Sequence, residues 1–179
     1  MLSRVVIALF LVALALPSAA LAQSLEVAPL SRDGQVLVSF SLGQELTDEI
    51  REAIHSGLTY SFVYKVDLRR GSSVWFDRTI ASAVVTATVR YDNLTRRYQV
   101  TRLLDGRTDW ADTTDREEIA WGWLTTGFDR LPLFSRTRLQ VNAEYYLRVR
   151  AHSTPRNALF LMPWQGDDVV GLAKFTFIR

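Results

Sequence analysis

The dominant pattern in this chain is an alternation of apolar and polar positions. Between residues 58 and 69 every even-numbered residue is apolar or aromatic, and most odd-numbered residues are polar. A period of two sustained over this length predicts a long β-strand with one buried face. The side chains expected on that buried face are Tyr60, Phe62, Tyr64 and Val66.

The same alternation recurs elsewhere, which indicates a sheet-rich protein. The further segments are residues 36–42, 81–91, 98–104 and 145–151, with a shorter candidate at 172–178. Near the start, a brief strand at 25–30 leads into Asp33-Gly34, a dipeptide typical of a hairpin turn. In the 145–151 segment, His152 follows the parity of Arg148 and Arg150, so we expect it to face solvent.

Two segments have helical features. The first is capped by Thr47, carries acidic residues in its first turn and stops at Gly57. The second is predicted to begin at Thr114, because Glu117 three residues later completes a capping box. His55 falls at the end of the first helix, where a cation interacts favourably with the helix dipole.

Long alternating strands with hairpin spacing favour antiparallel pairing with one face buried. Two helices are too few to connect this many strands as a parallel sheet. We therefore predict a mainly β protein, an antiparallel β-sandwich-like domain with two helical insertions. The alternative is an α+β arrangement with one curved antiparallel sheet.

The N-terminal residues predict export. Arg4 is followed by an apolar run from Val5 to Leu16, and Ala20-Leu21-Ala22 offers small residues at a cleavage site. The run is shorter than the ~20 residues that span a bilayer comfortably. We expect a signal peptide at 1–22, a single β-rich domain at 23–179, a periplasmic or secreted bacterial location, and no transmembrane segment after cleavage. The alternative is an uncleaved N-terminal anchor.

Composition narrows the chemistry further. The chain has no cysteine, which removes disulfides, thiol nucleophiles and thiolate metal sites, and its two histidines leave little material for a metal centre. The formal charge of +2 gives no electrostatic footprint for nucleic acid. No phosphate-cradling glycine loop and no Gly-x-Ser-x-Gly elbow is present, so we expect no cofactor and no familiar catalytic site.

Residues 105–118 are rich in carboxylates, which could hold calcium or serve a hydrolase. The spacing does not match an EF-hand loop. Asp105-Gly106 is a typical turn, and Asp115 and Glu117 suit a helix start. We therefore read this run as a loop and a helix cap, and not as a metal or catalytic site.

Arginines and aromatic residues are the candidate contact groups. Six arginines flank strand ends and could form an anion-binding or lipid-headgroup patch if the turns lie together; they are Arg69, Arg70, Arg96, Arg97, Arg102 and Arg107. Trp121 and Trp123 lie two positions apart in the second helix, so both cannot face the core. The apolar stretch 158–164 is either a buried element or an exposed patch. The possible contact surface comprises Trp121, Trp123, Phe160, Trp164, Arg96 and Arg97.

The order of these segments resembles a known family. The long strand at 58–69, the polar turn 91–101 between two strands, Leu104-Asp105-Gly106-Arg107 and the following helix together resemble an uncharacterised family of secreted bacterial proteins, domain of unknown function 4390. The resemblance covers roughly residues 36–150. It implies an exported single domain, and it brings no assigned activity or catalytic residue.

The most economical functional hypothesis is a non-catalytic periplasmic binding or accessory module that contacts a protein partner in the cell envelope. The alternatives are a carbohydrate or lipid-headgroup binder, and an unrecognised hydrolase that uses the acidic 105–118 region.

Overall fold

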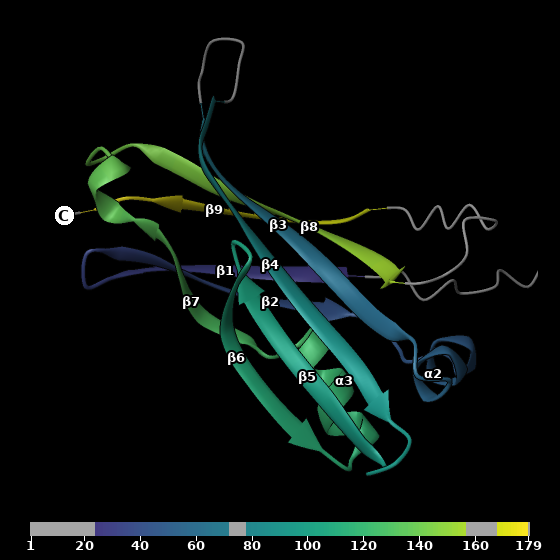
Figure 1. Cartoon of the computed structure of the whole chain (residues 1–179). Coiled ribbons are helices and arrows are strands. Elements are labelled where there is room, and N and C mark those ends of the chain that lie inside the picture. Colours follow the sequence, from purple (N-terminus) through teal and green to yellow (C-terminus); the bar gives the residue numbers. More distant parts are fainter. Residues whose placement is uncertain (1–23, 72–77, 157–167, 179) are drawn as a thin grey trace, which may run out of the picture.

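The computed structural model describes residues 24–71, 78–156 and 168–178. Within these residues the chain forms two antiparallel sheets and two α-helices (Figure 1). The strands are β1 (Ser24–Arg32), β2 (Gln35–Gly43), β3 (Thr59–Arg70), β4 (Arg78–Asp92), β5 (Arg97–Leu104), β6 (Arg107–Thr114), β7 (Phe128–Ser135), β8 (Glu144–Arg156) and β9 (Val169–Thr176). The helices are α2 (Asp48–His55), α3 (Glu117–Thr125) and a short 3₁₀ turn, η1 (Arg136–Arg138).

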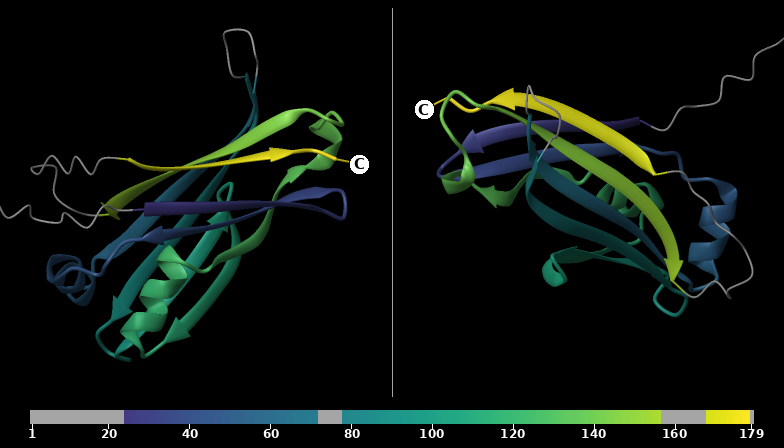
Figure 2. Two further views of the ribbon diagram at one scale, coloured as in Figure 1. Left: turned by 180° about the vertical axis from the view of Figure 1, so that it is seen from behind. Right: turned by 90° about the horizontal axis from the view of Figure 1, so that it is seen from above.

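The larger sheet has the strand order β6-β5-β4-β3-β8-β9, and the smaller has β1-β2-β7. The smaller sheet and α3 lie on the same side of the larger sheet (Figure 2). Every described pairing is antiparallel, and most strands pair with a neighbour in sequence. The predicted sandwich-like fold with two helical insertions is therefore confirmed, and the alternative of one curved sheet is not what forms.

The predicted register of the long strand is confirmed. Tyr60, Phe62, Tyr64 and Val66 on β3 are between 0 and 7% exposed. Their side chains meet those of the smaller sheet, where Phe40 stacks on Phe128 with ring centroids 4.4 Å apart. The Tyr64 hydroxyl donates to the Leu124 carbonyl oxygen at 2.7 Å, which fixes α3 to this core.

The hairpin and first-helix predictions also hold. Asp33 and Gly34 both have positive φ, at 49° and 78°, as a tight β1–β2 turn requires. The Thr47 hydroxyl accepts a hydrogen bond from the Ile50 amide and caps α2. Gly57 follows the helix with a φ of 86°, a conformation that favours glycine at a helix end.

The reading of residues 105–118 as a loop is wrong. Asp105 and Gly106, with φ of 47° and 81°, form the turn of a second hairpin, and residues 107–114 continue as strand β6. The predicted cap at Thr114 is also wrong: Thr114 is the buried last residue of β6, and α3 begins at Glu117 after Arg116, which makes no side-chain cap. Strand β7 was not predicted at all.

Candidate functional site

The first candidate site is an apolar groove beside Trp121. Its walls are the connection from β2 to α2 and one side of α3, and its volume is about 620 Å³. Leu42 and Thr125, both buried, contribute to the lining. Glu45 and Glu118 also line the groove, and both residues are exposed. The groove therefore offers an apolar hollow with acidic groups beside it.

Trp121 has a defined position in this groove. Its indole N–H donates to the Gln44 carbonyl oxygen at 2.9 Å, and its ring lies 5.6 Å from the ring of Phe62, edge to face. The Trp121 side chain is half-buried and packs against the hydrophobic core. Because both its hydrogen bond and its ring packing are fixed, Trp121 forms a rigid wall of the groove.

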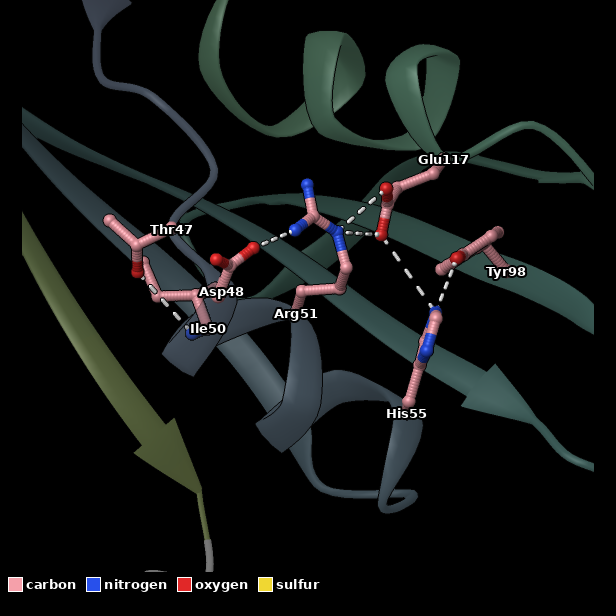
Figure 3. Close-up of polar contacts among 7 residues, drawn as sticks. All are labelled: Thr47, Asp48, Ile50, Arg51, His55, Tyr98 and Glu117. Carbon is pink, nitrogen blue, oxygen red and sulfur yellow. Dashed lines mark hydrogen bonds and ion pairs between the residues drawn. The ribbon is translucent and has the colours of Figure 1, made fainter.

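A second cluster joins the two helices through ionisable side chains (Figure 3). The Nε atom of Arg51 on α2 donates to both carboxylate oxygens of Glu117 at 3.0 Å, and Arg51 also pairs with Asp48. His55 Nε2 lies 2.7 Å from the Tyr98 hydroxyl and 3.8 Å from a Glu117 oxygen. The cluster thus ties the ends of α2 and α3 to strand β5.

Burial raises the pKa of Tyr98 to about 12, and the negative charge of Glu117 adds to the effect. The phenol therefore stays protonated at neutral pH and serves as a hydrogen-bonding partner of His55. Two carboxylates, Asp48 and Glu117, share one arginine, Arg51, so this cluster has no surplus of arginine over carboxylate. Such an arrangement is suited to holding helices in place.

A third polar cluster lies on the other face of the larger sheet. The Asp67 carboxylate, whose side chain is 4% exposed, accepts from Arg148 at 3.0 Å and from Arg150 at 3.3 Å. Its other oxygen accepts from the Ser82 hydroxyl at 2.7 Å. Burial alone would raise the pKa of Asp67, but the hydrogen bonds from Ser82 and Arg148 outweigh burial and lower it.

The predicted contact residues separate into three places. Trp121 lines the groove; Trp123 is half-buried on the same helix and packs edge to face on Trp110 of β6, with centroids 4.9 Å apart. Arg96 and Arg97 are exposed at the turn between β4 and β5. Phe160, Trp164 and the whole 158–164 stretch lie outside the described residues, as does the predicted signal peptide at 1–22.

The six strand-end arginines do not gather into one patch. Arg69 pairs with Thr79 near the start of β4, whereas Arg97 pairs with Asp92 at its end. Thirteen residues of extended strand separate these two positions, about 40 Å at the usual rise of a strand. The condition for a single arginine patch, that the turns lie together, is therefore not met.

The carboxylates of the 105–118 region have separate partners. Asp105 accepts from the Val84 amide at 2.8 Å, Asp109 pairs with Arg102, and Glu117 pairs with Arg51. Arg102 is held from two directions, because it also donates to the Gly127 carbonyl oxygen. These side chains stabilise the hairpin and the helix start. His152, predicted to face solvent, is exposed and lies 3.5 Å from Asp168.

Sequence reasoning missed Asp67, Arg51 and Tyr98 as members of clusters. Asp67 gave one available signal: it is an acid in a strand whose other polar positions are neutral or basic. The partners of Arg51 and Tyr98 lie 66 and 43 residues away in the chain, so no local pattern reveals them.

The chain matches the family described as Domain of unknown function (DUF4390) over residues 19–156. The match covers well over half of the 179 residues, and the chain belongs to this family. No curated protein and no solved structure matches the chain. Neither α2 nor α3, the α-helices of the described residues, is long and apolar enough to cross a membrane.

Proposed function

We propose that this protein is an exported, non-catalytic binding module that contacts a protein partner in the cell envelope. The observation that carries the proposal is the apolar groove beside Trp121. Its volume of about 620 Å³ has room for several apolar side chains of a partner, and the exposed Glu45 and Glu118 favour basic residues beside them. The N-terminal signal-like sequence supports an envelope location.

Rigidity supports a binding role for the groove. Its walls are held by the Trp121–Gln44 hydrogen bond, and Thr125 donates to the Trp121 carbonyl oxygen at 2.9 Å. A preformed hollow binds at lower entropic cost than one that must be ordered on binding. The enzyme alternative has less support, because the carboxylates of the 105–118 region already have partners in the fold.

The groove can be obstructed without disturbing the core. Gly122 lines it, and a Cβ atom there would meet only the Thr126 hydroxyl, at the ordinary contact distance of 3.6 Å. Gly122→Arg should therefore place a long charged side chain in the groove and obstruct it while α3 remains helical. Gly122→Ala is the matched control: it improves helix propensity by about 0.8–1 kcal/mol and leaves most of the hollow open.

The experiment compares tagged wild-type protein, Gly122→Ala and Gly122→Arg in the native host after cross-linking. We expect one partner protein to be recovered from the envelope fraction with the wild type and with Gly122→Ala, and to bind both in purified form. Gly122→Arg should lose that partner while melting no lower than the wild type. Equal binding by Gly122→Arg contradicts the proposal. Loss of the host phenotype in stable Glu117→Gln or Asp109→Asn favours the enzyme alternative.

A further inference from the structure

The outward face of the larger sheet carries a concentration of positive charge that the groove does not use. Strands β3, β8 and β9 are neighbours, and their register sets Arg69, Tyr146 and Lys174 in one row across the three strands. The next row places Arg148 between Asp67 and Leu172. Adjacent strands lie about 4.8 Å apart, so these cations share a small area of the sheet.

All the residues of these two rows except Asp67 line an open depression of about 830 Å³. Its lining residues include four cations, Arg69, Arg70, Arg148 and Lys174, and one carboxylate, Glu144. The Arg69 guanidinium lies 5.5 Å from the centre of the Tyr146 ring, which holds one cation against the floor. Among the described lining residues, cations therefore outnumber carboxylates, and Arg69 and Arg148 have contacts that position them.

Asp67 explains why this surplus is ordered. Asp67 lies beside Arg148 in the second of these rows. Its carboxylate forms ion pairs with two guanidinium groups, those of Arg148 and Arg150. A single buried carboxylate orients both arginines but neutralises only one charge. Asp67 is therefore a positioning residue for Arg148, and the area keeps a net positive charge.

The rim opposite the strands is also fixed. It is the connection from η1 to β8, whose Gln140 and Asn142 line the depression. The backbone N–H of Asn142 donates to the Phe177 carbonyl oxygen at 2.8 Å, and the backbone N–H of Gln140 donates to the Tyr145 hydroxyl at 2.7 Å. Backbone hydrogen bonds thus hold the rim against the end of the sheet before any ligand arrives.

We propose that this depression binds a doubly charged oxyanion of the phosphate-monoester kind. Guanidinium groups match the geometry of such an oxyanion with paired N–H donors, and the lysine adds a point charge. Arg70 and Lys174, together with Arg148, whose partner Asp67 also serves Arg150, outweigh the lining carboxylate of Glu144 and favour a dianion over a single carboxylate group. A membrane lipid headgroup and a soluble phosphate compound share this chemistry, and the site is distinct from the groove beside Trp121.

The test is an NMR titration of the isotope-labelled chain, as isolated from the cell envelope, with inorganic phosphate. We expect saturable shifts confined to residues that line the depression, and at least about tenfold weaker binding of acetate. Arg70→Gln combined with Lys174→Gln should weaken phosphate binding by about tenfold or more. Neither residue contacts Asp67, so the arginine network stays intact.

The matched control is Arg90→Gln combined with Arg107→Gln. It removes two positive charges from the same sheet, at exposed positions that do not line the depression. This control should bind phosphate as the wild type does. Equal loss in both double variants would mean a diffuse charge effect and would overturn the proposal. So would acetate binding as tight as phosphate binding, or the absence of saturable shifts at the depression.

The source of the oxyanion is resolved by a second arm with lipid vesicles. If the natural ligand is a headgroup, vesicles that contain phosphatidic acid, a lipid with a phosphate monoester, should bind the wild type and the control but not the Arg70→Gln, Lys174→Gln variant, and phosphatidylcholine vesicles should bind none. Phosphate binding without vesicle binding supports the site and assigns it to a soluble phosphate compound. Vesicle binding that is equal in all variants contradicts the site.

Discussion

The cluster around Asp67 and the cluster around Glu117 contain the same kinds of charged group in different proportions. Asp67 is one carboxylate between two arginines, buried on the face of a sheet. Glu117 and Asp48 are two carboxylates that share Arg51, with His55 nearby and part of the cluster open to solvent. The Asp67 cluster has more arginines than carboxylates, and the Glu117 cluster does not.

The difference shows how one type of interaction can serve two ends. Where carboxylates equal or outnumber arginines, the ion pairs hold elements together, as Arg51 and Glu117 do between α2 and α3. Where a buried acid fixes more cations than it neutralises, the sheet face keeps ordered donors and a positive potential that an anion can use. The free energy lost when one partner is removed should also be larger for the buried Asp67 cluster, because removal of one partner from a buried pair leaves an uncompensated charge.

The largest expected effect is on stability at neutral pH. Asp67→Ala should destabilise the protein by about 2–3 kcal/mol, toward the lower end for a broken buried ion pair because both arginines keep some solvent contact. Glu117→Ala should cost less, because Glu117 is 26% exposed and Arg51 retains Asp48 as a partner. Urea denaturation of both variants provides the measurement. A loss at Glu117 equal to or greater than that at Asp67 would break the comparison.

The second effect is on acid stability. The pKa of Asp67 is lower in the folded chain than its ordinary value of 3.8, so its stabilising contribution is complete above about pH 4 and disappears as the pH falls below it. Asp67→Asn should therefore flatten the fall in unfolding free energy between pH 5 and the acid limit, relative to the wild type.

The control for this acid experiment is Asp33→Asn, the same chemical change at an exposed position. Its left-handed backbone in the β1–β2 turn also suits asparagine. Denaturation series at several pH values compare the three proteins. An acid profile of Asp67→Asn that superimposes on the wild-type profile would mean that the ionised carboxylate is not what stabilises the arginine pair.

The smallest effect is at alkaline pH and reports on the other cluster. The pKa of Tyr98 is raised from about 10 to about 12, so the protonated phenol stabilises the fold below pH 10 and that contribution is lost as the pH rises toward 12. Ultraviolet titration of tyrosinate should show one fewer group ionising near pH 12 in Tyr98→Phe, with circular dichroism confirming that the chain is folded. A titration curve unchanged in that region would contradict the assignment.

The sequence predicted the elements whose residues carry a complete local signal. Strand β3 has a long, nearly regular alternation of apolar and polar residues, the β1–β2 turn has Asp33-Gly34, and α2 has its cap at Thr47. Strands β6 and β7 have no such signal because each lies at a sheet edge. Edge strands tolerate charged residues such as Asp109 and Asp112, and Pro132 fits an edge while arguing against an interior strand.

The sequence by itself determined the fold class and the inward faces of the strands, because a period of two specifies which side chains leave water together. Only the tertiary structure decided which charges meet. Asp67 and Arg148 are 81 residues apart in the chain, and Arg69 and Lys174 lie in one row only because β8 pairs with both β3 and β9. Polar positions on a strand look alike in sequence, and strand order makes one of them a buried counterion and another part of a cationic depression.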